Sequence, residues 1–546
     1  MPWPQTYDPL GNPWLSTLAA TLPLVVLLGS LGILRVKVYL AALYGLGAAL
    51  LVAVLIYQEP FFLAVTSAIY GAAYGLMPIG WIILNVLFLY QMAYQKGLFQ
   101  VMQGSLTSIT QDRRLQLLLV AFCLGAFFEG AAGFGTPVAV CASILIGLGF
   151  QPLAASVLAL IANTAPVPYA GLGTPLMALQ AVTGLDLYAL TQMVARQLFF
   201  FDILIPFWLV AVFAGWKGMI EIWPALLVTG VSYALVQLLV ASLHGPWLVN
   251  ILAALASMLV LVIFLRLWKP RRIWQFPSEE GTTVGGQNPT YSRKQILNAW
   301  MPWLILSVMV FAWGLPQVKN WMDSYSQVQL AVPGLHEQVL RVPPLVVAAR
   351  PEAALYNFNW LSASGTAILL AAILSGLLMG YSPLGMVKVY WQTLRLTWQS
   401  LLTISTTMAI GFVYRYGGLD GTLGLAFAHT GALYPFFGTI LGWLGVVLTG
   451  SDTSSNVLFG SLQRITAEQL GLNPVLMAAA NSSGGVMGKM INAQSLVVAS
   501  SATRFHGHES DILRSVFWHS LVLVGLVALL ILLQAYIPPF TRMVVH

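Results

Sequence analysis

Two short stretches decide how this chain folds: Phe127–Pro137, which reads FFEGAAGFGTP, and Gly450–Asn456, which reads GSDTSSN. Both are rich in glycine and hydroxyl side chains, both lie between apolar arms, and each contains one carboxylate, Glu129 or Asp452. A hydrocarbon core offers no water to unpaired backbone groups, so a non-helical break there survives only against protein or a wet cavity. A carboxylate at that depth is costly and marks a functional site. Two such breaks in corresponding halves indicate the binding site of a transporter.

The composition places the rest of the chain in a membrane. Of the 546 residues, 58% are hydrophobic and 8% are charged, whereas a soluble domain carries about 25% charge. The apolar segments follow one another almost without a break, which predicts a single membrane transport domain over residues 1–546. The net charge of +7 comes from basic residues scattered between apolar segments, and therefore indicates cytoplasmic loops and not a nucleic-acid surface. The N-terminus has no signal-peptide pattern.

The first stretch lies inside Leu115–Gly149, whose two apolar arms of about 13 residues would each reach about 20 Å. That length is short for a full crossing, so we predict a re-entrant hairpin over residues 115–149 that enters from the cytoplasm. The next segment, Gln151–Val182, is apolar but is interrupted at Asn163–Pro168 and again at Gly171–Pro175. Prolines and polar residues in the middle of a span break a helix, which predicts a discontinuous helix over residues 151–182.

The second stretch repeats this pattern. Residues 435–470 are predicted to form a second hairpin, and residues 474–503 a second broken helix. The prolines Pro152 and Pro474 open the two broken helices, and Asn481-Ser482 is expected to interrupt the second one where Asn163-Thr164 interrupts the first.

The expected fold is an all-α polytopic membrane protein with about twelve transmembrane helices, two re-entrant hairpins and discontinuous helices. The first half, residues 15–267, is joined to the second half, residues 297–537, by a basic linker, residues 268–296. Short basic loops face the cytoplasm, so counting crossings makes the halves inverted repeats with both chain ends outside. The polar stretch 316–357 is expected outside. Regular spans are predicted at 15–34, 38–57, 61–94 with a kink at Pro78, 195–213, 222–243, 247–267, 300–315, 359–379, 398–416 and 513–536.

Glu129 is the first candidate for coupling to protons. Removing an isolated carboxylate from water disfavours its charged form, which suits a group that takes up and releases a proton. The alternative is a structural carboxylate that caps the neighbouring half-helix. Asp452 has three possible roles: a second proton site, a partner for Lys489, or a cap on its own helix.

The remaining candidates would bind the substrate. Half-helix N-termini expose N–H groups and the positive end of a dipole, which bind a carboxylate, although some polar side chains only satisfy broken backbone. We expect the substrate's carboxylate between the two tips and the breaks at Asn163 and Asn481. The candidates are Gly133, Gly135, Thr136, Asn163, Thr164, Ser451, Thr453, Ser454, Ser455, Asn456, Asn481, Ser482, Ser483 and Lys489.

Lys489 is the cation expected to pair with that carboxylate; the alternatives are snorkelling or an ion pair with Asp452. Arg196 and Arg415 stand near predicted span ends, where an interfacial anchor is commoner than a ligand. The cysteines Cys123 and Cys141 are expected to pack in the apolar interior, and the histidines show no metal-binding spacing. We therefore expect no metal and no cofactor.

The two stretches and the segment NSSGGVMGKMINAQ (Asn481–Gln494) resemble the signature segments of the bacterial lactate permease family, and the resemblance extends over nearly the whole chain. It implies a multi-pass proton symporter of the bacterial inner membrane that imports lactate and glycolate, built from inverted repeats with re-entrant hairpins. The implied partners are lactate or a related small 2-hydroxymonocarboxylate, the proton as coupling ion, and membrane lipid, with no nucleic acid.

Two alternatives stay open. One is a sodium-coupled organic-anion transporter of related inverted-repeat architecture. The other class is an intramembrane enzyme or a channel, against which the spans contain no HExxH, Ser/His/Asp or Cys/His set. Hairpins that occlude the path also favour alternating access over an open pore. We therefore expect a transporter and not an enzyme.

Overall fold

The computed structural model of the protein describes residues 2–32, 34, 36–107, 109–133, 136–276 and 291–545. Most of the predicted linker 268–296 lies outside the described residues. The helices up to residue 267 are α1 (Pro13–Gly32), α2 (Val38–Leu55), α3 (Phe61–Tyr74), α4 (Trp81–Gln95), α5 (Leu98–Thr107), α6 (Arg113–Leu117), α7 (Gly125–Ala131), α8 (Thr136–Gly147), α9 (Pro152–Ala162), α10 (Ala170–Thr183), α11 (Leu187–Glu221), α12 (Trp223–Leu243) and α13 (Val249–Leu267).

The later helices are α14 (Arg293–Gly314), α15 (Pro316–Ser326), α16 (Ser364–Leu378), α17 (Pro383–Gly417), α18 (Leu419–Ala428), α19 (Tyr434–Thr449), α20 (Asp452–Gln469), α21 (Pro474–Gly488), α22 (Ala493–Ala502) and α23 (Glu509–Tyr536). Short π- or 3-10-helical turns are η1 (Gly75–Gly80), η2 (Leu118–Leu124), η3 (Val167–Tyr169), η5 (Gly431–Leu433) and η6 (Phe540–Met543). The strands are β1 (Trp3–Pro4), β2 (Gln327–Ala331), β3 (Val339–Arg341), β4 (Arg350–Pro351) and β5 (Leu355–Asn359).

The helices confirm a polytopic all-α membrane protein. Within the described residues, 11 helices are long and apolar enough to cross a membrane, or 12 if α9 and the segment Val167–Thr183, bent by 68°, form one broken span. This agrees with the expected number of about twelve. The inverted symmetry, the re-entrant character of the hairpins and the division into two halves stay predictions.

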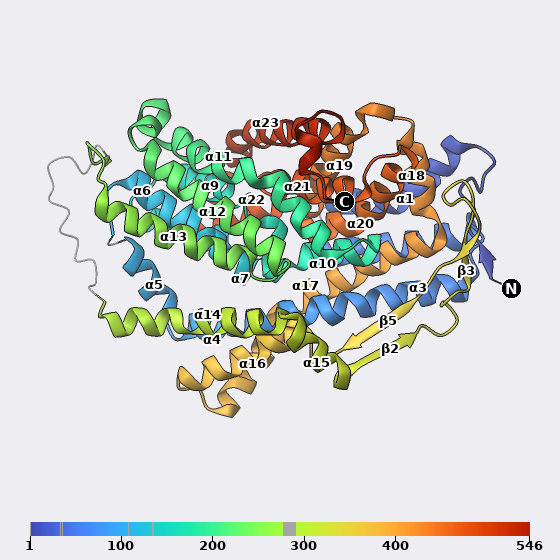
Figure 1. The fold of residues 1–546 in the computed structure, drawn as a ribbon, viewed down its shortest axis with the longest axis horizontal. Coiled ribbons are helices and arrows are strands. Elements are labelled where there is room, and N and C mark those ends of the chain that lie inside the picture. Colours follow the sequence, from blue (N-terminus) through green and yellow to red (C-terminus); the bar gives the residue numbers. More distant parts are fainter. Residues whose placement is uncertain are drawn as a thin grey trace.

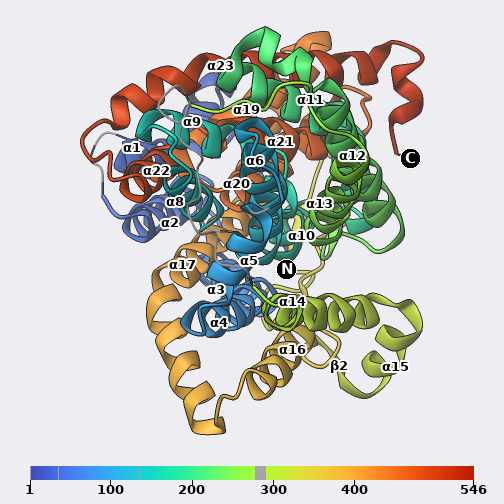
Figure 2. The same ribbon diagram turned by 90° about the vertical axis from the view of Figure 1, so that its left-hand side faces the viewer.

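The helices fall into a large bundle and a smaller group. In Figures 1 and 2, α4, α14, α15 and α16 lie in the lower part of the molecule, below the bundle that contains α9 to α13 and α19 to α23. α4, α14 and α16 pack against one another. The long helix α17 links the two groups, since it contacts α3 and α4 as well as α20.

Several helices are longer than hydropathy predicts. α11 and α17 extend over 35 residues each, with a kink in α11 at Gly215, where the expected spans were 195–213 and 398–416. Each helix continues to its capping residue: Asp186 accepts a hydrogen bond from the N–H of Ala189, and Ser382 accepts one from Gly385. Hydropathy marks only the apolar part of a helix, whereas caps set its ends. Another helix, α5, lies in the sequence that we expected to be a loop after residue 95.

The two tips have different backbone structure. At the first, α7 ends at Ala131 and α8 begins at Thr136. At the second, α19 ends at Thr449, and Gly450 turns the chain with φ +75°, a value that favours glycine. Ser451, not Asp452, then caps α20 by accepting a hydrogen bond from the N–H of Ser454 at 3.2 Å.

The first broken helix is interrupted as predicted. α9 ends at Ala162, and residues 171–173 form a left-handed turn with φ of +49°, +58° and +80°. Glycine suits this turn for two reasons: it tolerates positive φ, and a Cβ on Gly173 would lie 2.5 Å from Cβ of Pro246. The regular part of α10 therefore begins at Thr174.

The expected break at Asn481-Ser482 is wrong. Helix α21 runs through both residues to Gly488, and the interruption follows before Asn492, which caps α22. Polar side chains do not break a buried helix when neighbours satisfy them: Ser482 donates to Asp452 at 2.6 Å, and Ser483 donates to Gln197 at 2.7 Å.

The predicted external stretch 316–357 contains α15 and most of the strands. β2 pairs antiparallel with β5, and β3 pairs antiparallel with β4 and in parallel with β1 near the N-terminus. The side chain of Gln5, directly after β1, donates to the carbonyls of Arg415 and Tyr416 at the end of α17. The N-terminal segment and this loop thus form one cap over the end of α17, which we call the β cap (residues 2–8 and 327–359).

Candidate functional site

Glu129, Asp452 and Lys489 line one cavity of about 360 Å³. Its walls come from the two tips, the left-handed turn before α10, α17 and the break after α21. It reaches the surface at Lys37, Val38 and Gln399, whose side chains are exposed. The lining residues are Lys37, Val38, Tyr39, Glu129, Gly133, Val167, Ala170, Gly171, Thr174, Pro175, Gln399, Ser400, Thr403, Ile404, Thr449, Gly450, Ser451, Asp452, Thr453, Ser454, Lys489 and Gln494.

Glu129 has few partners for its charge. It lies in the last turn of α7 with 1% of its surface exposed, and its Oε2 has no hydrogen-bond partner among the described residues. The amide of Asn163 lies beside it, but neither polar atom of that amide forms a well-aligned hydrogen bond within the same residues. The neighbouring rings of Phe127 and Phe128 pack against Trp303 and Phe99. The chain therefore leaves this carboxylate nearly uncompensated at the cavity wall.

Asp452 lies in a network of polar side chains. Its Oδ2 accepts a hydrogen bond from Ser482 at 2.6 Å and one from Asn456 at 3.4 Å. Asn456 also donates to the carbonyl of Pro175 at 3.2 Å and accepts from Asn481 at 3.0 Å. These bonds connect α20 to α21 and to the start of α10, so Asp452 is held in place from three helices.

Lys489 is the cation between the two carboxylates. It caps the C-terminal end of α21, is 8% exposed, and donates from Nζ to the carbonyl of Gly450 at 2.7 Å. Glu129 and Asp452 both interact electrostatically with it. A second source of positive potential is the N-terminus of α20, whose first residues line the cavity.

An anion that enters this cavity thus meets an ammonium group and the N–H groups at the start of α20. The hydroxyls of Thr174, Thr453 and Ser454 line the same cavity. Such a set can hold a carboxylate and a neighbouring hydroxyl group of a small molecule.

The predicted residues fall into two groups. Glu129, Gly133, Ser451, Asp452, Thr453, Ser454 and Lys489 line the cavity. The others are buried and do not line the cavity: Asn163, Thr164, Ser455, Asn456, Asn481, Ser482 and Ser483. Most of them bond to protein; for example, Ser455 donates to the carbonyl of Gly442 and Thr164 to that of Ile161. Gly135 and the side chain of Thr136 lie outside the described residues.

Sequence reasoning missed several lining residues. Thr174 belongs to the Gly171–Pro175 interruption and Gln494 to the NSSGGVMGKMINAQ segment, so both could have been found from breaks already recognised. Gln399, Ser400 and Thr403 gave no such signal, because they lie in an unbroken part of α17. Only the packing of α17 against the tips brings them to the cavity.

A further buried carboxylate, Asp202, was also missed. It lies in α11, accepts a hydrogen bond from Gln237 of α12, and has one oxygen without a partner in the described part of the chain. A carboxylate within an apolar span was the available signal. Asp202 does not line the cavity.

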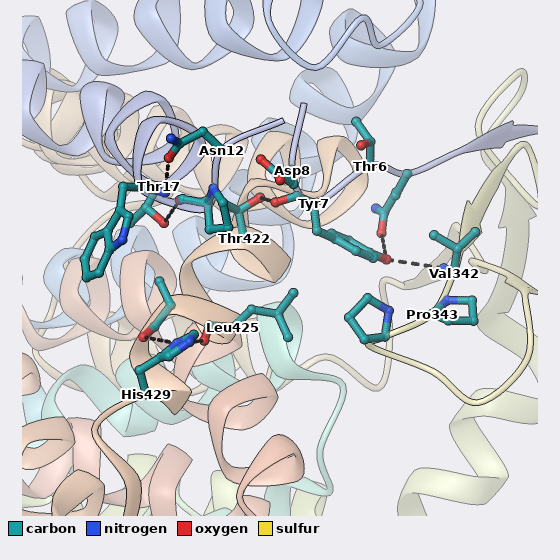
Figure 3. A pocket seen from close by; sticks show the side chains of 15 residues that line it. Thr6, Tyr7, Asp8, Asn12, Thr17, Val342, Pro343, Thr422, Leu425 and His429 are labelled. Carbon is teal, nitrogen blue, oxygen red and sulfur yellow. Dashed lines mark hydrogen bonds between the residues drawn. The ribbon is translucent and has the colours of Figure 1, made fainter. Parts of the chain in front are cut away.

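A larger cavity, of about 610 Å³, lies between the β cap, α1 and α18. Figure 3 shows Tyr7 beside Val342, whose N–H donates to the Tyr7 hydroxyl at 3.3 Å, and His429 on the opposite wall. This cavity contains none of the predicted site residues and no Lys or Arg among its lining residues. The smaller cavity is therefore the better candidate, because it brings the tips, both carboxylates and Lys489 together.

Comparison with known proteins gives the following matches. The model of the family described as L-lactate permease matches residues 16–538. The L-lactate permease of Salmonella typhimurium is 44% identical over 547 residues, 98% of each chain. The glycolate permease GlcA of Escherichia coli is 44% identical over 559 residues, which cover 100% of this chain and 99% of that one. The solved structure of MtrF from Neisseria gonorrhoeae matches with a TM-score of 0.46 and 13% identity, over 88% of this chain and 85% of that one.

Proposed function

The chain belongs to the L-lactate permease family, and from that premise we propose that it imports lactate, with glycolate as a second substrate, by proton symport. It is a multi-pass transporter of the bacterial inner membrane and not an enzyme. The two relatives are named for lactate and for glycolate, and both acids are small 2-hydroxymonocarboxylates. The substrate class of this chain is inferred from those names and from the chemistry of the cavity.

The observation that carries the proposal is the meeting of Glu129 and Lys489 in one cavity. Lys489 and the N-terminus of α20 would bind the substrate's carboxylate. The hydroxyls of Thr174 and Ser454 would bond to its 2-hydroxyl group. A three-carbon acid fits easily within a cavity of about 360 Å³.

Proton coupling follows from the charges around that cavity. With both carboxylates ionised, Lys489 faces two negative charges, and an incoming anion would add a third. A proton on Glu129 removes one of these charges at the residue with the fewest hydrogen bonds. Because like charges in a low-dielectric site repel strongly, anion binding and protonation of Glu129 favour each other. The two cargoes would then load together and leave together.

The cavity reaches the surface at Lys37, in the short basic loop that the positive-inside rule places in the cytoplasm. The conformation described here would therefore be the one that releases substrate inside. In the alternating-access cycle that we propose, Glu129 loses its proton from this state, and the empty carrier returns with Glu129 charged and paired to Lys489.

The test uses Glu129→Gln, which mimics the protonated carboxyl. In sodium-free proteoliposomes with an imposed pH gradient, the unchanged protein should concentrate lactate. The variant should retain lactate counterflow, within about threefold, but should only equilibrate lactate across the membrane, since it carries no proton.

Three different results would contradict the proposed coupling ion, the proton-carrying residue and the substrate. A requirement of the unchanged protein for sodium would contradict proton coupling and support the sodium-coupled alternative. If Glu129→Gln still concentrates lactate, the proton travels on another group, and Asp452 is the next candidate. An absence of lactate counterflow in the unchanged protein would contradict the substrate.

A further inference from the structure

Three helices connect the cavity to a second charged cluster. α10, α17 and α20 pack against one another, and each lines the cavity: α10 and α20 near their N-terminal ends at Thr174 and Ser454, and α17 near its middle at Ile404. Their C-terminal ends bring together Thr183, Arg415 and Arg464. At 1.5 Å per residue, the distance along each helix is about 14 to 17 Å. The cluster therefore lies at the opposite end of the helices from the cavity mouth at Lys37, on the side predicted to be external.

The seam between these helices is closed by apolar packing. A Cβ on Gly411 of α17 would lie 2.6 Å from Cγ1 of Val457, and one on Gly460 of α20 would lie 2.5 Å from Cδ1 of Leu179. Val182 contacts the same two glycines. Contacts this close leave no room for a substrate, so access from the external side requires α10, α17 and α20 to separate along this seam.

The external end of the seam carries three arginines. Arg415 donates from Nε to Oε1 of Glu352 at 2.8 Å, and its Nη2 lies 2.6 Å from the same oxygen; Arg341 lies 3.0 Å from the other oxygen of Glu352. Arg415 also donates to the carbonyl of Ala181 at 3.1 Å, and Arg464 donates to that of Thr183. The expectation that Arg415 is an interfacial anchor is therefore wrong, since its guanidinium is bound within this cluster.

Glu352 comes from the β cap and not from the bundle. Burial acts to raise the pKa of its carboxyl, but the charges of Arg341 and Arg415 outweigh burial and hold the pKa below its ordinary value. Glu352 is therefore ionised at neutral pH. Two guanidinium groups lie at its carboxylate, and guanidinium groups recognise carboxylates of any origin.

The arginines outnumber the buried acids. Asp420 lies 3.7 Å from Arg341 and accepts a hydrogen bond from Ser461, which gives two buried carboxylates for three arginines. The remaining acid, Glu468, is 41% exposed and lies 3.4 Å from Arg464. Removal of Glu352 would leave three arginines against the one buried carboxylate of Asp420, directly over the seam that leads to the cavity.

We propose that Arg341 of the β cap, Arg415 and Arg464 form a second carboxylate-binding site, which receives the substrate's carboxylate at the external end of the seam when the side chain of Glu352 turns away from the arginines. In the conformation described here, Glu352 occupies that site in place of substrate. The proposal rests on the proposed function, because the ligand is the same monocarboxylate. It adds a binding site on the external side, separate from the one formed by Glu129, Asp452 and Lys489.

Two substitutions with opposite expected effects test this site. Arg415→Gln removes a carboxylate-binding group, so the KM for external lactate should rise by about tenfold or more, the usual scale of a charge-assisted bond. Glu352→Gln removes the competing carboxylate and leaves the arginines in place, so the same KM should fall. Both are measured as lactate uptake by right-side-out vesicles, with cytoplasmic half-saturation in inside-out vesicles as the comparison.

The opposite directions of the two KM changes distinguish a binding site from a simple latch, which is an ion pair that only holds the seam closed. A latch predicts that both substitutions lower the external KM, because each breaks the same ion pair and favours opening. That result, or no change in either variant, would overturn the proposal. The matched control is Arg196→Gln, an arginine that donates to the carbonyl of Met543 away from the cluster and should leave the external KM unchanged.

Folding and function are controlled separately. If Arg415→Gln does not reach the membrane, Arg464→Gln replaces it, since that arginine is bound to the partly exposed Glu468, and the same rise is expected. Lactate counterflow by the unchanged protein shows whether the proposed function holds. If the unchanged protein shows lactate counterflow but the arginine variant has an unaltered KM for external lactate, only the proposed external site is wrong.

Discussion

The two tips carry one carboxylate each, but the surroundings of these carboxylates are different. At the second tip, Oδ2 of Asp452 accepts hydrogen bonds from Ser482 and Asn456 and is connected through them to α10 and α21, while its Oδ1 has no partner among the described residues. At the first tip, Glu129 lies beside the amide of Asn163, and its Oε2 has no partner among the described residues. Hydrogen bonds to the ionised form of a carboxylate favour that form, so the donors around Asp452 support its charge more than the surroundings of Glu129 do.

The difference follows from the two stretches themselves. GSDTSSN places hydroxyl and amide groups within one helical turn of its carboxylate, and α21 adds Ser482 from the other side. FFEGAAGFGTP surrounds its carboxylate with phenylalanine, alanine and glycine. We therefore propose that the first tip carries the moving proton and that the second tip maintains the shape of the site.

The largest effect is expected from the cation that the two tips share. Lys489→Gln leaves two buried carboxylates without their ammonium partner, a change that typically costs about 3 kcal/mol or more. Lactate counterflow should fall at least about a hundredfold. Lys388→Gln, at an exposed lysine of α17 that does not line the cavity, is the control and should change counterflow by less than about threefold. Nearly normal counterflow in Lys489→Gln would contradict the central place given to this lysine.

The next effect compares the two carboxylates directly. Asp452→Asn weakens charge-assisted hydrogen bonds and should lower the free energy of unfolding by about 1–3 kcal/mol. Glu129→Gln removes the charge of a buried carboxylate whose Oε2 has no hydrogen-bond partner among the described residues, and should leave that free energy unchanged or raise it. The measurement is thermal unfolding of the detergent-solubilised variants at one pH. Equal losses in both variants would remove the contrast between the tips.

A smaller effect tests the network behind Asp452. Ser482→Ala deletes the 2.6 Å hydrogen bond to Asp452 and should destabilise the protein by about 1 kcal/mol. The matched change on the first side is Thr164→Val, because the Thr164 hydroxyl donates to the carbonyl of Ile161 in the preceding turn. That variant should stay within about 0.5 kcal/mol of the unchanged protein. A loss in Thr164→Val as large as in Ser482→Ala would mean that the first side is supported in the same way.

A pH-dependent effect provides a baseline for the comparison. Glu59 is buried between α2 and α3, and burial raises its pKa to about 8. A carboxyl whose pKa is higher in the folded than in the unfolded state stabilises the fold at low pH, and this contribution is lost as pH rises. The unchanged protein should therefore lose stability between about pH 4.3, the unfolded value, and about pH 8.

Glu59→Gln should remove this part of the pH dependence. Thermal unfolding is recorded over that range for Glu59→Gln and for Glu59→Gln combined with Glu129→Gln. If part of the pH dependence of stability remains in Glu59→Gln and vanishes in the double variant, that part belongs to Glu129. An unchanged slope in Glu59→Gln would show that Glu59 does not titrate as described.

Much of the fold could be predicted from the sequence. The apolar spans, the kink at Pro78, the turn at Gly171–Gly173 and the tips at Glu129 and Asp452 are all visible in the order of residues. The physical reason is that a hydrocarbon environment requires each span to satisfy its own backbone. That requirement is local, so the positions of proline, glycine and carboxylate residues within apolar segments indicate where a helix is interrupted and where a polar site is buried.

What the tertiary structure decided depends on partners far away in the chain. α21 runs through Asn481-Ser482 because Asp452, 30 residues earlier, and Gln197, 286 residues from Ser483, accept hydrogen bonds from its serines. Arg415 turns into the charged cluster because Glu352 of the β cap, 63 residues before it, accepts its hydrogen bonds. The local sequence shows which groups need a partner, because the cost of burying an unpaired polar group is a property of the group itself. The packing of distant helices decides which partner each group receives, because only the folded chain brings those partners within hydrogen-bonding distance.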